Sequence, residues 1–78
     1  MPCRAGITTR PEERRAEWER QVVGLTNWRI LGTYRSRQEA QAHENRYAQQ
    51  TGCRAGAGGS DAPGLWHVYR FDYIRERS

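Results

Sequence analysis

The sequence has 78 residues, of which 36% are hydrophobic, 10% aromatic and 28% charged, and it carries a net charge of +4. That length suits one small domain over residues 1–78. Three tryptophans and four tyrosines supply enough apolar surface for a core, which excludes a disordered chain.

The sequence also excludes two kinds of membrane targeting. It has no apolar run near the roughly 20 residues of a membrane helix, and residues 1–4 lack the apolar core of a signal peptide. We therefore expect a cytoplasmic protein that is a monomer and has no membrane partner. Because the cytoplasm keeps thiols reduced, Cys3 and Cys53 are expected to be free.

The first elements are a strand and a helix. Residues 3–8 form a short, weakly apolar run that predicts a strand. Thr9 and Glu12 have the spacing of a capping box, which predicts a helix to about Val23, ended by Gly24. The apolar stripe of this helix consists of Trp18, Val22 and Leu25.

Two aromatic-rich stretches predict further strands, at residues 28–34 and 65–73. In the first, one face is expected to carry Trp28, Ile30 and Tyr34. In residues 65–73, the alternation of side chains places Trp66 and Val68 on one face of the predicted strand and a second group on the opposite face. That other side consists of Leu65, Tyr69, Phe71 and Tyr73.

A second helix is predicted between these strands. Ser36 and Glu39 form another capping box, and Gly52 ends a helix that reaches about Gln50. Residues 54–64 have the composition of a flexible loop. The chain therefore predicts an α/β (α+β) fold, in which a small three-stranded antiparallel sheet and two helices follow the order strand-helix-strand-helix-strand.

Two segments within residues 3–52 resemble the GIY-YIG nuclease module. The first is Arg4-Ala5-Gly6-Ile7-Thr8-Thr9, followed by Pro11-Glu12-Glu13-Arg14-Arg15 and then Glu17-Trp18. It is similar to the part of the family in which a Tyr-x-Gly strand leads into a helix with a catalytic arginine. Gly6 matches that glycine and Arg14 that arginine. The second segment, residues 39–44, resembles the family's Glu-Ala-x-x-x-Glu helix, whose later glutamate, here Glu44, holds a divalent metal.

The resemblance has two departures. The family begins with a Gly-Ile-Tyr strand, for which this chain has no room before residues 3–8, and Arg4 replaces the tyrosine of Tyr-x-Gly. A circular permutation would account for the first departure. The strand at residues 65–73 would then fill the vacant place in the sheet and bring Tyr69 near the lost tyrosine.

The resemblance implies three candidate catalytic residues, Arg14, Glu44 and Tyr69. Glu44 would hold Mg²⁺, a hard cation that suits oxygen ligands, and Arg14 would stabilise charge on a phosphate. Because a glutamate on a core-facing side of a helix is costly unless paired, an ion pair with Arg14 or Arg15 is the alternative role of Glu44.

The basic residues point to an anionic partner, DNA or RNA. All 13 are arginine, whose planar fork of donors suits phosphate, although a genome of high GC content would also favour arginine over lysine. The candidates for phosphate contact are Arg4, Arg10, Arg14, Arg15, Arg35 and Arg37.

For function, the missing tyrosines favour a non-catalytic GIY-YIG-like module that binds nucleic acid, or a protein partner, through an Arg-rich surface and requires no cofactor. The alternative is a metal-dependent endonuclease that cleaves phosphodiester bonds at a rearranged active site with Mg²⁺.

Overall fold

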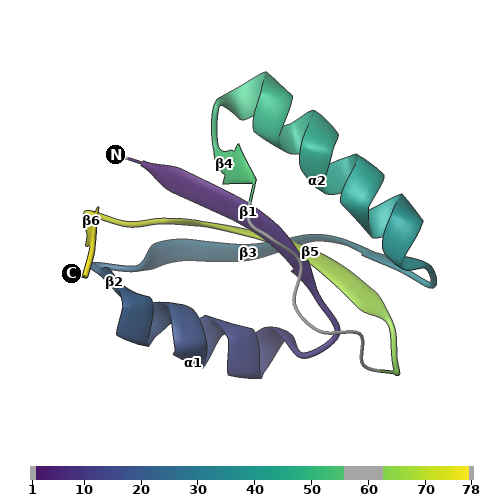
Figure 1. Ribbon diagram of the computed structural model, residues 1–78, viewed down its shortest axis with the longest axis horizontal. Coiled ribbons are helices and arrows are strands. Elements are labelled where there is room, and N and C mark those ends of the chain that lie inside the picture. Colours follow the sequence, from purple (N-terminus) through teal and green to yellow (C-terminus); the bar gives the residue numbers. More distant parts are fainter. Residues whose placement is uncertain (1, 56–62, 78) are drawn as a thin grey trace.

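A four-stranded sheet runs through the middle of the molecule, and one helix covers each of its faces (Figure 1). The computed structural model describes residues 2–55 and 63–77. The elements are β1 (Cys3–Thr8), α1 (Pro11–Gln21), β2 (Val22–Val23), β3 (Thr26–Tyr34), α2 (Arg37–Thr51), β4 (Arg54–Ala55), β5 (Trp66–Asp72) and β6 (Arg75–Glu76). Of the helices in these two ranges, neither is long and apolar enough to cross a bilayer.

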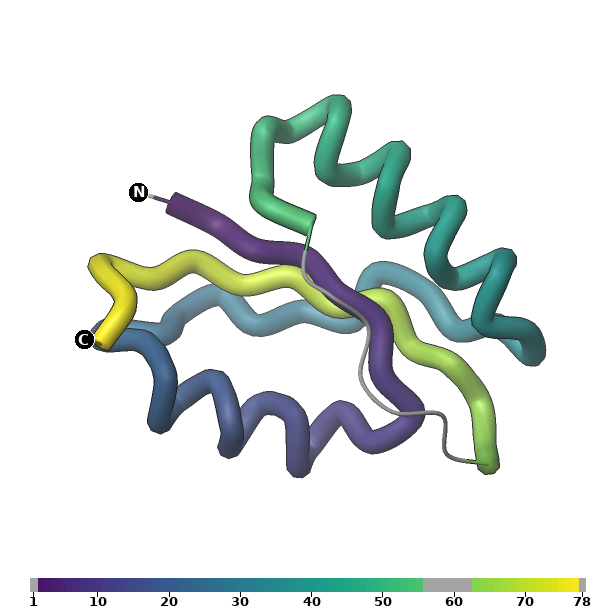
Figure 2. Tube along the Cα trace, in the orientation of Figure 1, coloured from purple at the N-terminus to yellow at the C-terminus, as the bar shows by residue number. Residues whose placement is uncertain are grey.

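The strands of the sheet lie in the order β3-β5-β1-β4. The central strand β5 is antiparallel to both β1 and β3, and β4 adds to the outer edge of β1 in parallel. A separate ribbon of β2 and β6 closes one end of the molecule, close to both chain ends (Figure 2). The predicted class and the order of its five long elements are confirmed. The two-residue strands β2, β4 and β6 were not predicted, since two residues are too few to show an alternating pattern.

The second helix begins and ends where its capping residues predict. The Ser36 hydroxyl accepts a hydrogen bond from the Glu39 amide at 3.2 Å, and Gly52 ends the helix in the left-handed conformation, with φ of 79°.

The first capping box is wrong. The residue before α1 is Arg10, and no side chain caps the helix. The Thr8 hydroxyl accepts from the Arg10 amide at 3.0 Å, so a threonine one place earlier than predicted makes the local bond. The helix also ends at Gln21 rather than Val23, because Val22 turns to extended backbone and pairs with Glu76.

Two apolar clusters form the core, one on each face of the sheet. The cluster under α2 consists of Ile7, Ala40, Trp66 and Val68. The cluster on the α1 face consists of Val22, Tyr69, Phe71 and Tyr73, with Trp18, Leu25 and Trp28 packed against it. The predicted alternation along β5 is therefore confirmed, because its successive side chains enter different clusters. Leu65 lies before the strand and is exposed.

The predicted common face of β3 is wrong. The pairing of β3 with β5 shifts register twice, between Thr26 and Arg29 and again between Ile30 and Gly32. Each shift adds a residue to β3 and breaks the two-residue alternation. Trp28 consequently packs in the α1 cluster, whereas Tyr34 packs in the α2 cluster.

Cys3 and Cys53 form a disulfide, which contradicts the expectation of free thiols. The parallel pairing of Arg4 with Arg54 brings the two cysteines to a Cα separation of 4.8 Å, although they are 50 residues apart in sequence. The expectation failed because it followed from the predicted compartment and not from the distance between the residues. The bond ties the start of β1 to the end of α2.

Candidate functional site

The Tyr69 side chain occupies the centre of the α1 face and is 1% exposed. Its hydroxyl accepts a hydrogen bond from the Trp18 indole N–H at 2.9 Å, and its ring stacks on Trp28 with centroids 4.7 Å apart. Burial raises the pKa of Tyr69, while the bond from Trp18 acts in the opposite direction. The phenol is therefore held protonated inside the core.

The three candidate catalytic residues are electrostatically linked at this hydroxyl. Besides the effect of burial, the charge of Arg14 lowers the pKa of Tyr69 and that of Glu44 raises it. Arg14 comes from α1 and Glu44 from α2, which cover opposite faces of the sheet. Both charges therefore influence one phenol across the sheet, and no hydrogen bond or ion pair among the described residues joins Arg14 or Glu44 to it.

The alternative role of Glu44, an ion pair between the helices, is not what the structure contains. Arg14 lies 3.9 Å from Glu17, and Arg15 lies 3.7 Å from Glu19. Both partners are on the same helix as the arginine, three or four residues further along, where helix geometry makes neighbours.

Glu44 is instead a fully buried carboxyl with 0% exposure. One oxygen accepts a hydrogen bond from the Gln41 side-chain amide, and the other has no hydrogen-bond partner. Burial raises the pKa of Glu44, although the Gln41 bond acts against the shift. The carboxyl is therefore biased toward its neutral form.

This environment does not suit Mg²⁺. The ion keeps several water molecules when proteins bind it, and it binds to ionised carboxylates. Glu44 has no open surface and no ion pair to a described cation, and no three His, Cys, Asp or Glu side chains gather in the described part of the chain. The surroundings of the Glu44 carboxyl therefore suit a buried polar group better than a metal ligand.

Of the six arginines predicted to contact phosphate, four are engaged by carboxylates. Arg4 pairs with Glu76, Arg10 with Glu13 at 3.3 Å, and Arg14 and Arg15 with glutamates of α1. The Arg37 guanidinium lies over the Trp66 ring, 5.7 Å from its centroid. Only Arg35 combines exposure with the absence of an ion pair among the described residues.

The net positive charge therefore comes from outside residues 10–21, although one arginine of α1, Arg20, also has no ion pair to a described carboxylate. Residues 10–21 contain four arginines and four glutamates. Arginines without an ion pair to a described carboxylate are Arg20, Arg29, Arg35, Arg46, Arg54, Arg75 and Arg77, all of them exposed. Six of these lie outside the six candidates given above, although glutamates three and four residues from an arginine in a predicted helix already indicate which arginines pair locally.

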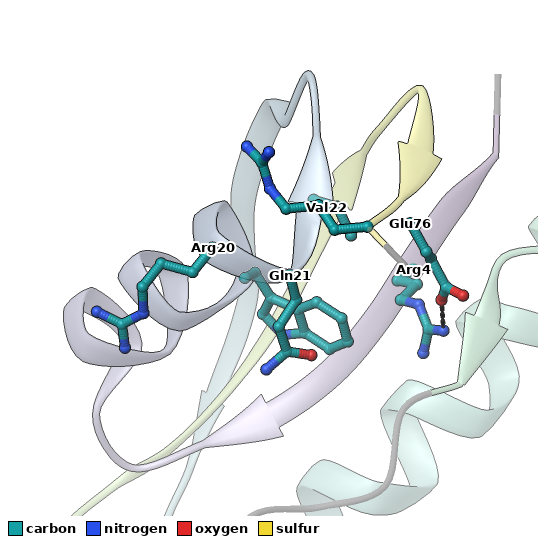
Figure 3. A pocket seen from close by; sticks show the side chains of 7 residues that line it. Arg4, Arg20, Gln21, Val22 and Glu76 are labelled. Atoms are coloured by element: carbon teal, nitrogen blue, oxygen red, sulfur yellow. Dashed lines mark hydrogen bonds and ion pairs between the residues drawn. The ribbon is translucent and has the colours of Figure 1, made fainter.

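Two of these arginines, together with the paired Arg4, line one cavity of about 450 Å³ at the carboxyl end of α1 (Figure 3). Its walls come from that helix, from the start of β1 and from the β2–β6 ribbon. The lining residues are Arg4, Trp18, Arg20, Gln21, Val22, Glu76 and Arg77. A smaller cavity of about 200 Å³ lies along α2, lined by His43, Arg46, Tyr47 and Gln50.

Comparison with known proteins gives no match among family models, curated proteins or solved structures. The GIY-YIG resemblance thus stays a prediction from short motifs.

Proposed function

We propose that the protein is a nucleic-acid-binding module that does not cleave its ligand. The observation that supports this most is the distribution of charge. Because the arginines and glutamates of residues 10–21 balance, the net charge of +4 resides on the rest of the surface. There it is carried by exposed arginines whose donors are not used by described carboxylates.

An exposed, unpaired guanidinium is well suited to a phosphate. It presents a planar fork of donors, and its binding displaces counterions from the nucleic acid, which makes affinity fall as salt rises. An arginine already held by a glutamate must first break that pair. We therefore assign the phosphate contacts to the unpaired set, Arg35 among them, and give Arg10, Arg14 and Arg15 a lesser part.

The buried state of the candidate catalytic groups supports binding without cleavage. A general base must come within hydrogen-bond reach of the proton that it removes, and it contributes about 10²–10⁴-fold to a rate. The Tyr69 hydroxyl is bonded to Trp18 inside the core, and Glu44 has no exposed surface. Neither group can meet a phosphodiester without movement of the elements that cover it.

The test is fluorescence anisotropy with labelled single-stranded and double-stranded oligonucleotides over a range of salt concentrations. We expect binding at low ionic strength and a linear fall of log K with log salt, with a slope of about −0.7 per phosphate contact on single strands. Arg15→Gln, which removes an ion-paired arginine, is the control and should leave this slope unchanged. Absence of binding to every oligonucleotide at the lowest salt would refute the proposal.

A second candidate function, endonuclease, is favoured by one observation. The charges of Arg14 and Glu44 both influence the pKa of Tyr69, and β5, which carries Tyr69, lies between β3 and β1 in the sheet. The test is incubation of supercoiled plasmid with the protein and Mg²⁺ or Mn²⁺. Nicking that is lost in both Arg14→Ala and Glu44→Ala would establish the nuclease and replace the first proposal.

A further inference from the structure

The cavity at the carboxyl end of α1 is built from segments far apart in sequence. Its rim is held by backbone pairing: the Arg77 amide donates to the Gln21 carbonyl at 2.8 Å, and Val22 pairs with Glu76. The volume of about 450 Å³ falls in the usual range of ligand sites. The cavity is therefore a formed feature of the fold, since its walls do not depend on exposed side chains alone.

One arginine of the cavity is fixed and the others are not. The Arg4 guanidinium lies over the Trp18 ring, 4.9 Å from its centroid, and pairs with Glu76, so it is anchored on two sides. Its Nε is buried without a hydrogen-bond partner. Arg20 and Arg77 are exposed and have no ion pair among the described residues. With one glutamate against three arginines, the lining has a surplus of positive charge.

The arginines are spread along the cavity and do not converge on one point. In Figure 3 the guanidinium groups of Arg4 and Arg20 lie on either side of Gln21, whose side-chain amide reaches into the space between them. A single inorganic anion would contact one end only. A ligand with anionic groups at regular intervals would contact both, and the amide of Gln21 supplies a further donor between them.

We propose that this cavity binds a single-stranded segment of nucleic acid, with separate phosphate contacts at Arg20, at Arg77 and at Arg4. The assignment rests on the proposed function and names its site. A concave wall with a positive lining follows one strand, as in other single-strand binders, whereas a duplex presents a convex surface too wide to enter.

The experiment compares two double variants with equal loss of charge. Arg20→Gln/Arg77→Gln removes the unpaired arginines of the cavity, and Arg10→Gln/Arg15→Gln removes two exposed arginines that are ion-paired with glutamates of α1. The probe is a labelled single-stranded oligonucleotide, titrated at several salt concentrations. The cavity variant should reduce the magnitude of the salt slope by about 1.4, and the matched variant should leave it near the wild-type value. Circular dichroism confirms that both variants fold.

Three outcomes would overturn the inference. An equal change of slope in both variants would place the phosphates on a diffuse surface, while the proposed function would stand. A labelled hairpin duplex that shows the same loss in the cavity variant would refute the assignment to a single strand. A wild-type protein that binds no oligonucleotide would end the proposed function and the inference together.

A second readout locates the ligand without mutation. In an NMR titration with the same oligonucleotide, the side-chain amide of Gln21 and the indole N–H of Trp18 should shift early. Shifts confined to the residues of α2 would refute the site.

Discussion

The phenol ring of Tyr69 on β5 lies across Gly6 of the neighbouring strand β1. The two residues are paired in the sheet, and a Cβ on Gly6 would collide with the Tyr69 hydroxyl and ring. Because Gly6 has no side chain, the ring extends over β1 and its hydroxyl reaches the indole of Trp18 on α1. The glycine thus positions the group through which the central strand is bonded to the first helix.

Gly6→Ala is expected to destabilise the protein by about 1–3 kcal/mol, because the new methyl group forces the Tyr69 ring out of its place. Gly32→Ala is the matched control on the same sheet: its Cβ would meet the His43 ring at 3.1 Å, so the loss should be smaller. Urea midpoints measure both. A Gly6→Ala variant as stable as the wild type would show that the ring has another position of equal energy.

Reduction of the Cys3–Cys53 disulfide is expected to lower the free energy of unfolding. With a separation of 50 residues, the chain-entropy relation gives a loss of about 4 kcal/mol. Urea unfolding with and without dithiothreitol measures the difference, and the double variant Cys3→Ser/Cys53→Ser should behave like the reduced protein. Rapid alkylation of the untreated, folded protein at both cysteines would contradict the bond itself.

The buried carboxyl of Glu44 makes stability depend on pH. Its pKa is raised in the folded state by burial, so the folded protein holds the proton more tightly than the unfolded chain. The contribution of Glu44 to stability is then greatest below the usual glutamate pKa of about 4.3, and it falls as pH rises through the raised pKa. Glu44→Gln should therefore gain about 1–3 kcal/mol relative to the wild type at alkaline pH, and much less at pH near 4.

Melting temperatures of the two proteins over this pH range make the comparison. Glu39→Gln is the control, since Glu39 is an exposed carboxyl on the same helix and should gain no stability at high pH. A difference between wild type and Glu44→Gln that stays constant with pH would mean that Glu44 does not change its protonation in this range.

Asn27 lies at the first register shift of β3 with a positive φ of 55°, and its side-chain amide donates to Asp72 at 2.8 Å. Asn27→Gly loses the hydrogen bond but adopts the conformation freely, whereas Asn27→Ala loses the bond and adds a backbone cost of about 1–2 kcal/mol. The alanine variant should be the less stable of the two in urea unfolding. The reverse order of stability would show that the left-handed backbone conformation at position 27 carries no cost for alanine.

The parts of the fold that local chemistry decides were predictable. The cap at Ser36 and the glycine after α2 act within a few residues, and the alternation of β5 is a property of consecutive side chains. The two shifts in β3 were not, because each depends on pairing with β5, which is far along the chain. The identities of Trp28 and Tyr34 do not themselves predict that a bulge lies between them.

The same division applies to the candidate site. The sequence pointed to Arg14, Glu44 and Tyr69 through short motifs, but Arg14 and Glu44 lie on helices that cover opposite faces of the sheet. Their burial could not be read from spacing, since it depends on how Trp18 and the sheet cover them. The cavity at the end of α1 was missed because β6, which forms one wall, pairs with β2 across more than fifty residues.

The disulfide divides the chain into a closed covalent ring, from Cys3 to Cys53, and an open tail that contains β5. The ring contains β1 and β3, which do not pair with each other. Strand β5, from the tail, lies between them and pairs with both. Both apolar clusters take large side chains from β5. During synthesis the two helices and their flanking strands therefore emerge before β5, and neither apolar cluster can be completed until β5 has left the ribosome.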